Sequence, residues 1–568
     1  MKKQLLFGLS ILVAVVFSSC KNLTDLDPSL FTCTPNPLET KAGQVDATIT
    51  GTFPVKYFAK NAVVTVTPVM RMSNGESVKA APSVFQGEKV VGNNNVIAYK
   101  AGGSYTIKTT FNYVPEMAVS ELYLEFSVEA RSKVYDLKPV KVADGVIATS
   151  ELVQNKFKGD MGSAIIADKF ERDIMEMTDA EILFLIQQST VRSSETSSDD
   201  IKALSQKIVD AKNELNKSVE SLQISAYASP DGAIDLNTAL AERRQKETEK
   251  FLNAELKKIK SPLTIESRFT PEDWAGFQKL MEESNIQDKQ LILRVLSMYQ
   301  DPEQREREIK NLAAAFKQIA DEVLPQLRRS QLKLMVKVTG KSDAEIAQFA
   351  KNDVSKLDVE ELLYAATLTA DLDEKAAIYQ KAVKAYPGDI RAHNNLGVVK
   401  YQQDKIDDAA ASFAKALQID ARNADANYNA GLCAMAKGKP DEALVYFGKA
   451  AGTSGNLKNA TGTYYVGAGD YTKAKSSFAG VNSNNAALTQ ILNKEYNAAK
   501  NTLAAVEQPD AMTAYLAAIV AARTNDKDGV YANLKTAVGK KSACGAKAAK
   551  DLEFSKFWSD ATFQSIVK

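Results

Sequence analysis

A single histidine, His393, and four cysteines are all that this 568-residue chain offers for imidazole or thiol chemistry. This shortage excludes a histidine-rich metal site, a serine–histidine catalytic triad and a disulfide-dense scaffold. Neither charge is in excess, because 71 lysines and arginines stand against 70 aspartates and glutamates. A balanced chain has no basic surface for nucleic acid, so we expect no nucleic-acid partner.

The sequence also lacks the common motifs of catalysis. It contains no Gly-x-Gly-x-x-Gly, no phosphate-binding loop, no Gly-x-Ser-x-Gly and no cluster of metal-ligand residues. Acid–base chemistry would have to use carboxylates, lysines or tyrosines, and no pair of carboxylates stands out from solvated helix faces. We therefore predict a protein that is not an enzyme and that holds no cofactor and no metal.

Long hydrophobic runs are scarce. The run at the start of the chain, Leu5 to Phe17, is about 13 residues long and too short to span a bilayer. Two lysines precede it, and Cys20 follows it after two serines. This pattern resembles a bacterial lipoprotein signal, with a plain secretory signal and an incidental cysteine as the alternative. The resemblance implies that residues 1–19 are a signal peptide and that Cys20 carries acyl chains, such as palmitate, which hold the protein at a membrane.

Residues 20–44 are expected to tether the first domain to this lipid. The residues that directly follow Cys20 contain no acidic run of the kind that marks export to the cell surface. This favours the periplasmic face of the outer membrane.

Three further cysteines, Cys33, Cys433 and Cys544, are widely spaced. The chain has no Cys-x-x-Cys pair, which excludes zinc and thioredoxin-like sites. Cys433 lies in a helical segment and is expected to be a small buried residue. Cys33 and Cys544 are either free or paired.

Residues 45–149 show the two-residue period of β-strands. Apolar and polar residues alternate along residues 121–129, and residues 105–113 repeat the pattern. Asn74-Gly75 and Gly102-Gly103 supply turns. We predict an all-β domain, an antiparallel sandwich of immunoglobulin-like kind, which serves as a spacer or docking module. A linker at residues 150–176 is expected to follow it.

Residues 177–345 alternate strands with helices. Periodicity predicts strands at 181–186, 222–227 and 331–338 and helices at 201–219 and 236–257. This β-α-β-α-β order indicates a compact α/β domain. Residues 258–330 interrupt the domain as an insertion that contains Trp274 and an amphipathic helix around residues 303–327.

A motif follows the second of these strands. It runs Ala226-Tyr227-Ala228-Ser229-Pro230-Asp231-Gly232, continues with Asn237 and ends with Leu240-Ala241-Glu242-Arg243-Arg244. It resembles the signature of OmpA-like peptidoglycan-binding domains, in which an aspartate binds the amine of a diaminopimelate residue and the second arginine pairs with its carboxylate. Arg244 matches that arginine, but Ser229 stands in the place of the aspartate, and a neutral hydroxyl cannot supply a charge-assisted bond. The candidate peptidoglycan-binding residues are thus Ser229, Asp231, Asn237 and Arg244.

Residues 355–540 are helical and repetitive. The run Ala392-His393-Asn394-Asn395-Leu396-Gly397 recurs as Ala426-Asn427-Tyr428-Asn429-Ala430-Gly431. Small and aromatic residues of the helix that follows recur at the same period: Ala409, Phe413 and Ala416, then Ala443, Phe447 and Ala450. The pattern resembles the tetratricopeptide repeat, whose period is about 34 residues, and it implies an α-solenoid that binds peptides or helices. His393 stands where that family has a large aromatic residue, so we expect it to pack rather than to bind a ligand.

These features lead to two functional predictions. The first is a lipid-anchored scaffold of the cell envelope that binds a protein partner through the repeats. Residues 541–568 are expected to form a helical cap at the end of these repeats. The order of domains resembles that of lipoproteins from Bacteroides-type bacteria. The alternative is a lipoprotein that tethers the outer membrane to peptidoglycan through the OmpA-like domain.

Overall fold

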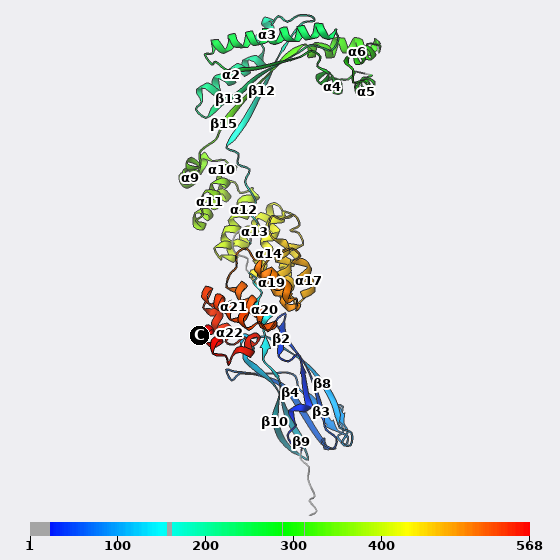
Figure 1. The fold of residues 1–568 in the computed structure, drawn as a ribbon, viewed down its shortest axis with the longest axis vertical. Helices are drawn as coiled ribbons and strands as arrows, with labels where there is room; N and C mark the ends of the chain where they lie inside the picture. Colours follow the sequence, from blue (N-terminus) through cyan, green and yellow to red (C-terminus); the bar gives the residue numbers. More distant parts are fainter. Residues whose placement is uncertain (1–22, 156–161, 287, 312) are drawn as a thin grey trace, which may run out of the picture. The chain divides into compact units, whose positions relative to one another are not determined.

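The computed structural model describes residues 23–155, 162–286, 288–311 and 313–568, and Figure 1 shows it as a ribbon. The chain divides into two compact units. The first unit comprises Met1–Ala167 and Ala370–Lys568, as far as these are described, and the second comprises Asp168–Thr369. The predicted signal peptide and Cys20 lie outside the described residues.

The first unit begins with a β-rich region. Its strands are β1 Phe31–Thr34, β2 Leu38–Lys41, β3 Gln44–Phe53, β4 Ala62–Met72, β5 Ser77–Lys79, β6 Ser83–Gly87, β7 Asn95–Ile97, β8 Gly103–Asn112, β9 Ser120–Ala130, β10 Lys133–Asp144 and β11 Val146–Ile147. One sheet has the order β1-β3-β2-β11, with β8 paired to β3, and the other has the order β10-β9-β4-β6-β7, with β5 paired to β4. Side chains from both sheets form one core, in which Ile49, Val64 and Leu124 are fully buried. The prediction of a β-rich N-terminal region is confirmed.

The β-rich region starts earlier than the sequence indicates, because β1 and β2 lie inside the predicted tether of residues 20–44. Leu38 is fully buried, and the ring of Phe31 lies 5.7 Å from that of Phe126, measured between ring centroids. The two strands have four residues each, and Pro35 and Pro37 stand between them. Short strands around prolines have the sequence pattern of a loop, which explains the difference.

The second unit is built on a mixed sheet with α-helices. Its main elements are β12 Asp173–Leu183, α1 Ser193–Thr196, α2 Asp199–Asn213, β13 Lys217–Tyr227, α3 Ile234–Lys258, β14 Ile265–Thr270 and β15 Arg329–Thr339. The sheet order is β12-β15-β13-β14, with β15 antiparallel to β12 and β13, and β14 parallel to β13. Helices α2 and α3 bury Leu204 and Leu252 in one core with Ile224 and Leu334 of the sheet.

Several boundaries in this unit differ from the expected ones. Strand β12 begins inside the predicted linker, where Asp173 pairs with Thr339 although the side chains of this end are exposed. Helix α2 ends at Asn213, earlier than expected, and β13 starts soon after it. Strand β14 falls in the range predicted as insertion. Main-chain pairing to a neighbouring strand fixes β12 and β14, and the period of their own side chains shows this pairing poorly.

The inserted helices therefore occupy residues 274–327. They are α4 Trp274–Glu283, α5 Lys289–Met298, α6 Pro302–Lys310, α7 Ala313–Gln318, a π-helical turn Ile319–Val323 and α8 Leu324–Leu327. They have a core of their own, in which Phe277, Met281, Ile292 and Leu327 are buried. Helices α9 Asp343–Asn352 and α10 Val359–Ala365 complete this unit, so that the first helix of the predicted repeat region groups with it.

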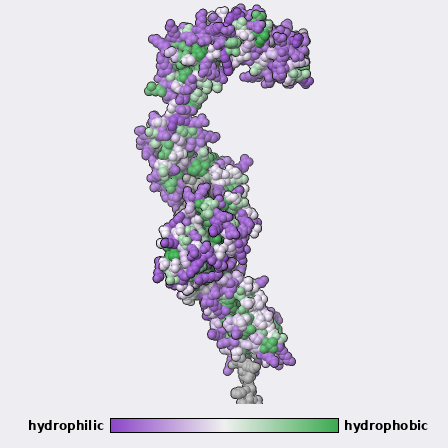
Figure 2. Space-filling model, in the orientation of Figure 1, coloured by the Kyte–Doolittle hydropathy of each residue, from purple (hydrophilic) through white to green (hydrophobic). Residues whose placement is uncertain are grey.

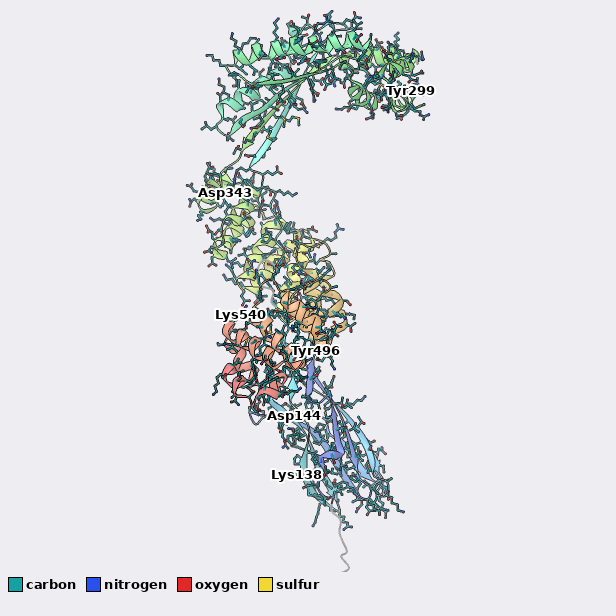
Figure 3. The ribbon with its side chains drawn as sticks, viewed as in Figure 1. Lys138, Asp144, Tyr299, Asp343, Tyr496 and Lys540 are labelled. Atoms are coloured by element: carbon teal, nitrogen blue, oxygen red, sulfur yellow. The ribbon has the colours of Figure 1, made fainter. Side chains whose placement is uncertain are left out.

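The rest of the first unit is an array of antiparallel helix pairs. Its helices are α11 Leu372–Ala385, α12 Ile390–Gln402, α13 Ile406–Ile419, α14 Ala424–Ala436, α15 Pro440–Phe447, α16 Leu457–Gly467, α17 Tyr471–Ser477, α18 Asn484–Leu492, α19 Tyr496–Ala504, α20 Ala511–Arg523 and α21 Lys527–Lys540. Helices α22 Ala543–Ala548 and α23 Ala561–Val567 follow, with a 3-10 helix Leu552–Phe557 between them. Figure 2 shows that hydrophilic side chains predominate on the visible face, and Figure 3 places Tyr496 on α19 and Lys540 on α21.

Candidate functional site

The motif residues Ser229, Asp231 and Asn237 meet at the turn between β13 and α3. The Asn237 side chain fixes this turn, because Nδ2 donates to the carbonyl oxygens of Ser229, at 3.1 Å, and Gly232, at 2.9 Å. The Ser229 hydroxyl donates to Asp231. Arg328, just after the inserted helices, lies 3.3 Å from Ser229 Oγ and 3.5 Å from Asp231 Oδ2. Arg328 thus supplies a cation for Asp231 from the chain that follows the inserted helices.

Arg244, the fourth motif residue, is fully buried. Its guanidinium donates to three main-chain carbonyl oxygens, those of Tyr227 at 2.8 Å, Gln188 at 3.0 Å and Leu185 at 3.4 Å. It also lies 5.1 Å from the ring centroid of Phe184. Burial, followed by the charge of Arg328, lowers the pKa of Arg244 to about 10. Arg244 therefore links the segment with Leu185 and Gln188 to the end of β13, where Tyr227 lies.

The inserted helices pack against the same turn. Pro230 and Asp231 line a cavity of about 10 Å³ together with side chains of the insertion, namely Trp274, Phe277, Glu306, Ile309, Phe316, Ile319 and Leu324. A volume this small admits no sugar or peptide. Ser229, Asp231 and Asn237 meet at this turn, where Asp231 is paired with Arg328, whereas Arg244 is enclosed and bonds to other parts of the chain.

The repeat-signature residues lie where helices of a pair approach closely. A Cβ added to Gly397 would stand 2.6 Å from the ring of Phe413, and one on Gly431 would stand 2.4 Å from the ring of Phe447. These distances leave no room for a side chain. The alanines of the signature, Ala409, Ala416, Ala443 and Ala450, are fully buried. A third unit, with Gly462 against Phe478, keeps the same contact.

Three of the first helices carry a buried asparagine at the same repeat position, to which the sequence motifs assign no function. Asn395 of α12, Asn429 of α14 and Asn485 of α18 are buried, and each pairs its side-chain amide with both main-chain groups of one distant residue. We call these three residues the asparagine ladder. Their partner is the chain between the β-rich region and β12, described at residues 149–155 and 162–167, which we call the inner-face segment.

The ladder contacts have a common geometry. Asn395 receives the N–H of Ile166 at 3.0 Å and donates to its carbonyl oxygen at 2.8 Å. Asn429 pairs in the same way with Ala164, at 2.7 Å for both bonds. Asn485 pairs with Gln154, at 2.9 Å for both. Each asparagine side chain thus forms, with one residue, the two hydrogen bonds that a neighbouring β-strand would form with its main chain.

A sequence signal for the ladder exists. Asn395 and Asn429 stand next but one before Gly397 and Gly431, and Asn485 has the same position relative to Ala487. Ala487 and Leu503 are separated in the sequence by the same interval as each signature glycine and its phenylalanine. A buried amide that recurs at one repeat position needs a partner of its own.

The inner-face segment also joins the β-rich region to the end of the array. Leu152 is buried in the core of the last helix pairs. Thr149 donates to the carboxylate of Glu553, and that carboxylate receives a bidentate ion pair from Arg523. Ser150 donates to the carbonyl oxygen of Thr40 in β2, at 2.9 Å. These two parts of the first unit are therefore packed together.

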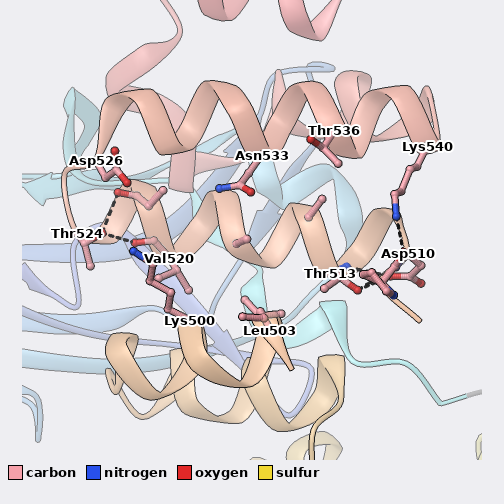
Figure 4. A pocket seen from close by; sticks show the side chains of 15 residues that line it. Lys500, Leu503, Asp510, Thr513, Val520, Thr524, Asp526, Asn533, Thr536 and Lys540 are labelled. Atoms are coloured by element: carbon pink, nitrogen blue, oxygen red, sulfur yellow. Dashed lines mark hydrogen bonds between the residues drawn. The ribbon is translucent and has the colours of Figure 1, made fainter. Parts of the chain in front are cut away.

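A groove lies between α19, α20 and α21 (Figure 4). Its volume is about 400 Å³. Its lining includes alanines 514, 517 and 521 of α20 and the charged residues Lys500, Asp510 and Asp526. The groove has the size of a small-ligand pocket. Its lining has no group of catalytic residues.

The remaining candidate residues have structural contacts. His393 Nε2 lies 3.0 Å from the carbonyl oxygen of Pro387, in agreement with a packing role. Cys33, Cys433 and Cys544 form no disulfide, and burial raises the pKa of Cys433 to about 12. In the described parts of the chain, no group of three or more histidine, cysteine or acidic side chains could hold a metal ion. No helix in these parts is long and apolar enough to cross a membrane.

Comparison with known proteins bears on the helical array. A family model of the tetratricopeptide repeat matches residues 369–424 and 394–456. The array contains tetratricopeptide repeats. The match covers the helix pairs with Gly397 and Gly431, and helices α16–α21 follow it in the chain. A search of curated proteins finds no match to the chain.

Several solved structures are similar to part of the chain. A tetratricopeptide repeat protein from Parabacteroides merdae is 14% identical over 40% of this chain and 90% of that chain, with a TM-score of 0.31. PilF of Pseudomonas aeruginosa is 18% identical over 39% of this chain and all of its own, with a TM-score of 0.29. PilW, a type IV pilus biogenesis factor, is 19% identical over 38% of this chain and all of its own, with a TM-score of 0.29.

Proposed function

We propose that this protein is a non-enzymatic scaffold of the bacterial cell envelope, anchored by a lipid on Cys20, whose tetratricopeptide array binds a protein partner. The observation that carries this proposal is the array itself, a stack of helix pairs closed by the contacts of Gly397 with Phe413 and Gly431 with Phe447. Stacked helical repeats present extended surfaces that suit protein ligands. The N-terminal pattern supports the lipid anchor, and we place it at the periplasmic face of the outer membrane.

Crosslinking of the full chain in native membranes tests the scaffold function. The partner is expected to crosslink to lysines of the array, such as Lys500 and Lys540. Crosslinks confined to the β-rich region or to the second unit would contradict it. A Cys20→Ala variant tests the anchor separately, because it should leave the membrane fraction while the array stays folded.

A peptidoglycan tether is the second candidate, supported by the register of Ser229, Asp231, Asn237 and Arg244 with the OmpA-like signature. The geometry favours the tether less than the scaffold, because Arg244 is enclosed and bonded to three carbonyl oxygens. Cosedimentation of the full chain with purified sacculi tests it. Binding that an Asp231→Asn variant loses, with its folding intact, would establish the tether, and no binding by the unaltered chain would refute it.

A further inference from the structure

We propose that the inner face of the tetratricopeptide array is closed to protein partners, because the inner-face segment of the same chain occupies it as a resident ligand through main-chain hydrogen bonds. The inner face is the one formed by α12, α14, α16, α18 and α20. The partner of the scaffold is then bound on other surfaces of the array. This inference rests on the proposed function and deepens it, because it states which face of the array is closed.

The contacts show that the site recognises main chain. Asn395, Asn429 and Asn485 each satisfy one N–H and one carbonyl oxygen of the segment, and both groups belong to the same residue in every case. Every non-proline residue offers this donor and acceptor. The ladder therefore does not select a sequence through these bonds.

Further inner-face residues bind main-chain oxygens or support the ladder. Asn394 donates to the carbonyl oxygen of Ala164 at 2.9 Å, and the Tyr428 hydroxyl donates to that of Gly162 at 3.2 Å. Asn429 also donates to Asn394 Oδ1 at 2.9 Å, and Asn485 donates to Thr463 Oγ1 at 2.8 Å. Asn429 and Asn485 are thus each held in place by a polar side chain of the preceding first helix, α12 or α16.

The inner-face segment must have a small side chain where it meets the asparagine ladder. Ala164 is 1% exposed and packs in the core of the array, whereas the next residue, Ile165, is 44% exposed. A large residue at position 164 has no space, and one at position 165 points away. The site therefore fits an extended segment with a small residue at the Asn429 position.

Covalent attachment favours the resident segment over any competitor. The β-rich region is packed on the end of the array through Leu152 and Glu553, so the segment is held at its N-terminal side by a folded domain. A tethered ligand has an effective concentration of about millimolar. A partner segment of equal intrinsic affinity at micromolar concentration would therefore displace it from only a small fraction of the molecules.

A peptide added in trans tests the inference on the full chain. The probe is a fluorescein-labelled peptide with the sequence of residues 162–168. The variant Ala164→Trp should expel the resident segment and bind the probe at least tenfold more tightly than the unaltered chain does. Ile165→Trp is the matched control and should bind as weakly as the unaltered chain. Equal binding to all three proteins, or binding to none at about millimolar probe, would overturn the proposal.

Hydrogen exchange gives a second readout if Ala164→Trp fails to fold. The amide protons of Ala164 and Ile166 should exchange slowly in the unaltered chain and at least tenfold faster in Asn395→Ala/Asn429→Ala, while helix α20 keeps its protection. Asn501→Ala, at an exposed asparagine of α19, is the control. Equal exchange at positions 164 and 166 in all three proteins would refute the inference. A partner captured on the inner face by crosslinking would also refute it and would leave the scaffold function standing.

Discussion

The inner face of the array and the turn that contains Arg244 use the same kind of interaction at different ranges. In both places buried polar side chains bond to main-chain carbonyl oxygens. Arg244 serves oxygens at most 59 residues away in the sequence, whereas Asn395 and Asn485 reach 229 and 331 residues away. The first arrangement locks a turn inside one unit, and the second fastens a distant segment to the array. Polar residues that match a ligand-binding pattern can thus have their hydrogen bonds satisfied by main-chain groups of the same chain.

The largest effect is expected for Arg244→Ala, which removes the short-range contacts of this comparison. It leaves three carbonyl oxygens without a charged donor and opens a cavity, so the second unit should lose about 3–5 kcal/mol of unfolding free energy. Arg243→Ala, at the exposed neighbour, should have little effect. The chain has two tryptophans, Trp274 and Trp558, so the fluorescence of Trp274 in a Trp558→Phe background reports on this unit. A stable Arg244→Ala protein that loses sacculus binding would instead assign Arg244 to a ligand.

Gly431→Ala tests the helix contact on which the ladder depends. The added Cβ would stand 2.4 Å from the ring of Phe447, so overpacking should cost about 1–3 kcal/mol. Gly539→Ala is the matched control, because nothing lies within 4 Å of its added Cβ. Alanine in an open helical position should be neutral or stabilise the helix by about 0.5–1 kcal/mol. Thermal unfolding followed by circular dichroism at a helix wavelength compares the two, and equal shifts would contradict the close approach.

Asn485→Ala addresses the long-range half of the comparison. It removes both bonds to Gln154 and the bond to Thr463, and we expect a loss of about 1–2 kcal/mol. The loss should show in the unfolding of the first unit, monitored by Trp558 in a Trp274→Phe background. Asn501→Ala should be neutral. If Asn485→Ala is neutral as well, residue 154 is held by its neighbours alone.

The smallest effect is expected for Ser229→Ala. The hydroxyl donates to Asp231 and lies 3.3 Å from Arg328 Nε, so its removal should cost about 0.5–1.5 kcal/mol. Trp274 fluorescence in denaturant measures this change. A gain in stability would show that the hydroxyl is held for a ligand rather than for the turn.

The repeats could be predicted from sequence, because each depends on a local pattern. Gly397 and Phe413 belong to one helix pair, and their recurrence one period later as Gly431 and Phe447 reveals the contact that the structure shows. The alternation in residues 121–129 predicted β9 for the same reason. The meeting of Ser229, Asp231 and Asn237 also followed, because they share one turn.

The features that the sequence did not predict depend on contacts between distant parts of the chain. Strands β1 and β12 are held by main-chain pairing to β3 and β15, which side-chain periodicity does not record. Arg244 is held by the carbonyl oxygens of Leu185 and Gln188, which lie in an irregular segment whose position the motif does not predict. The ladder is visible in the sequence as recurring asparagines, but its ligand belongs to a much earlier part of the chain and carries no motif.

The position of the inner-face segment has a consequence for the order in which the molecule is made. The ribosome and any export machinery deliver residues 149–167 before the array, so no free end has to be threaded through a finished groove. The helices with Asn395, Asn429 and Asn485 emerge later and can close on a strand that is already present. Contacts of such long sequence separation slow folding. The array should therefore acquire its final exchange protection last, after the β-rich region has folded.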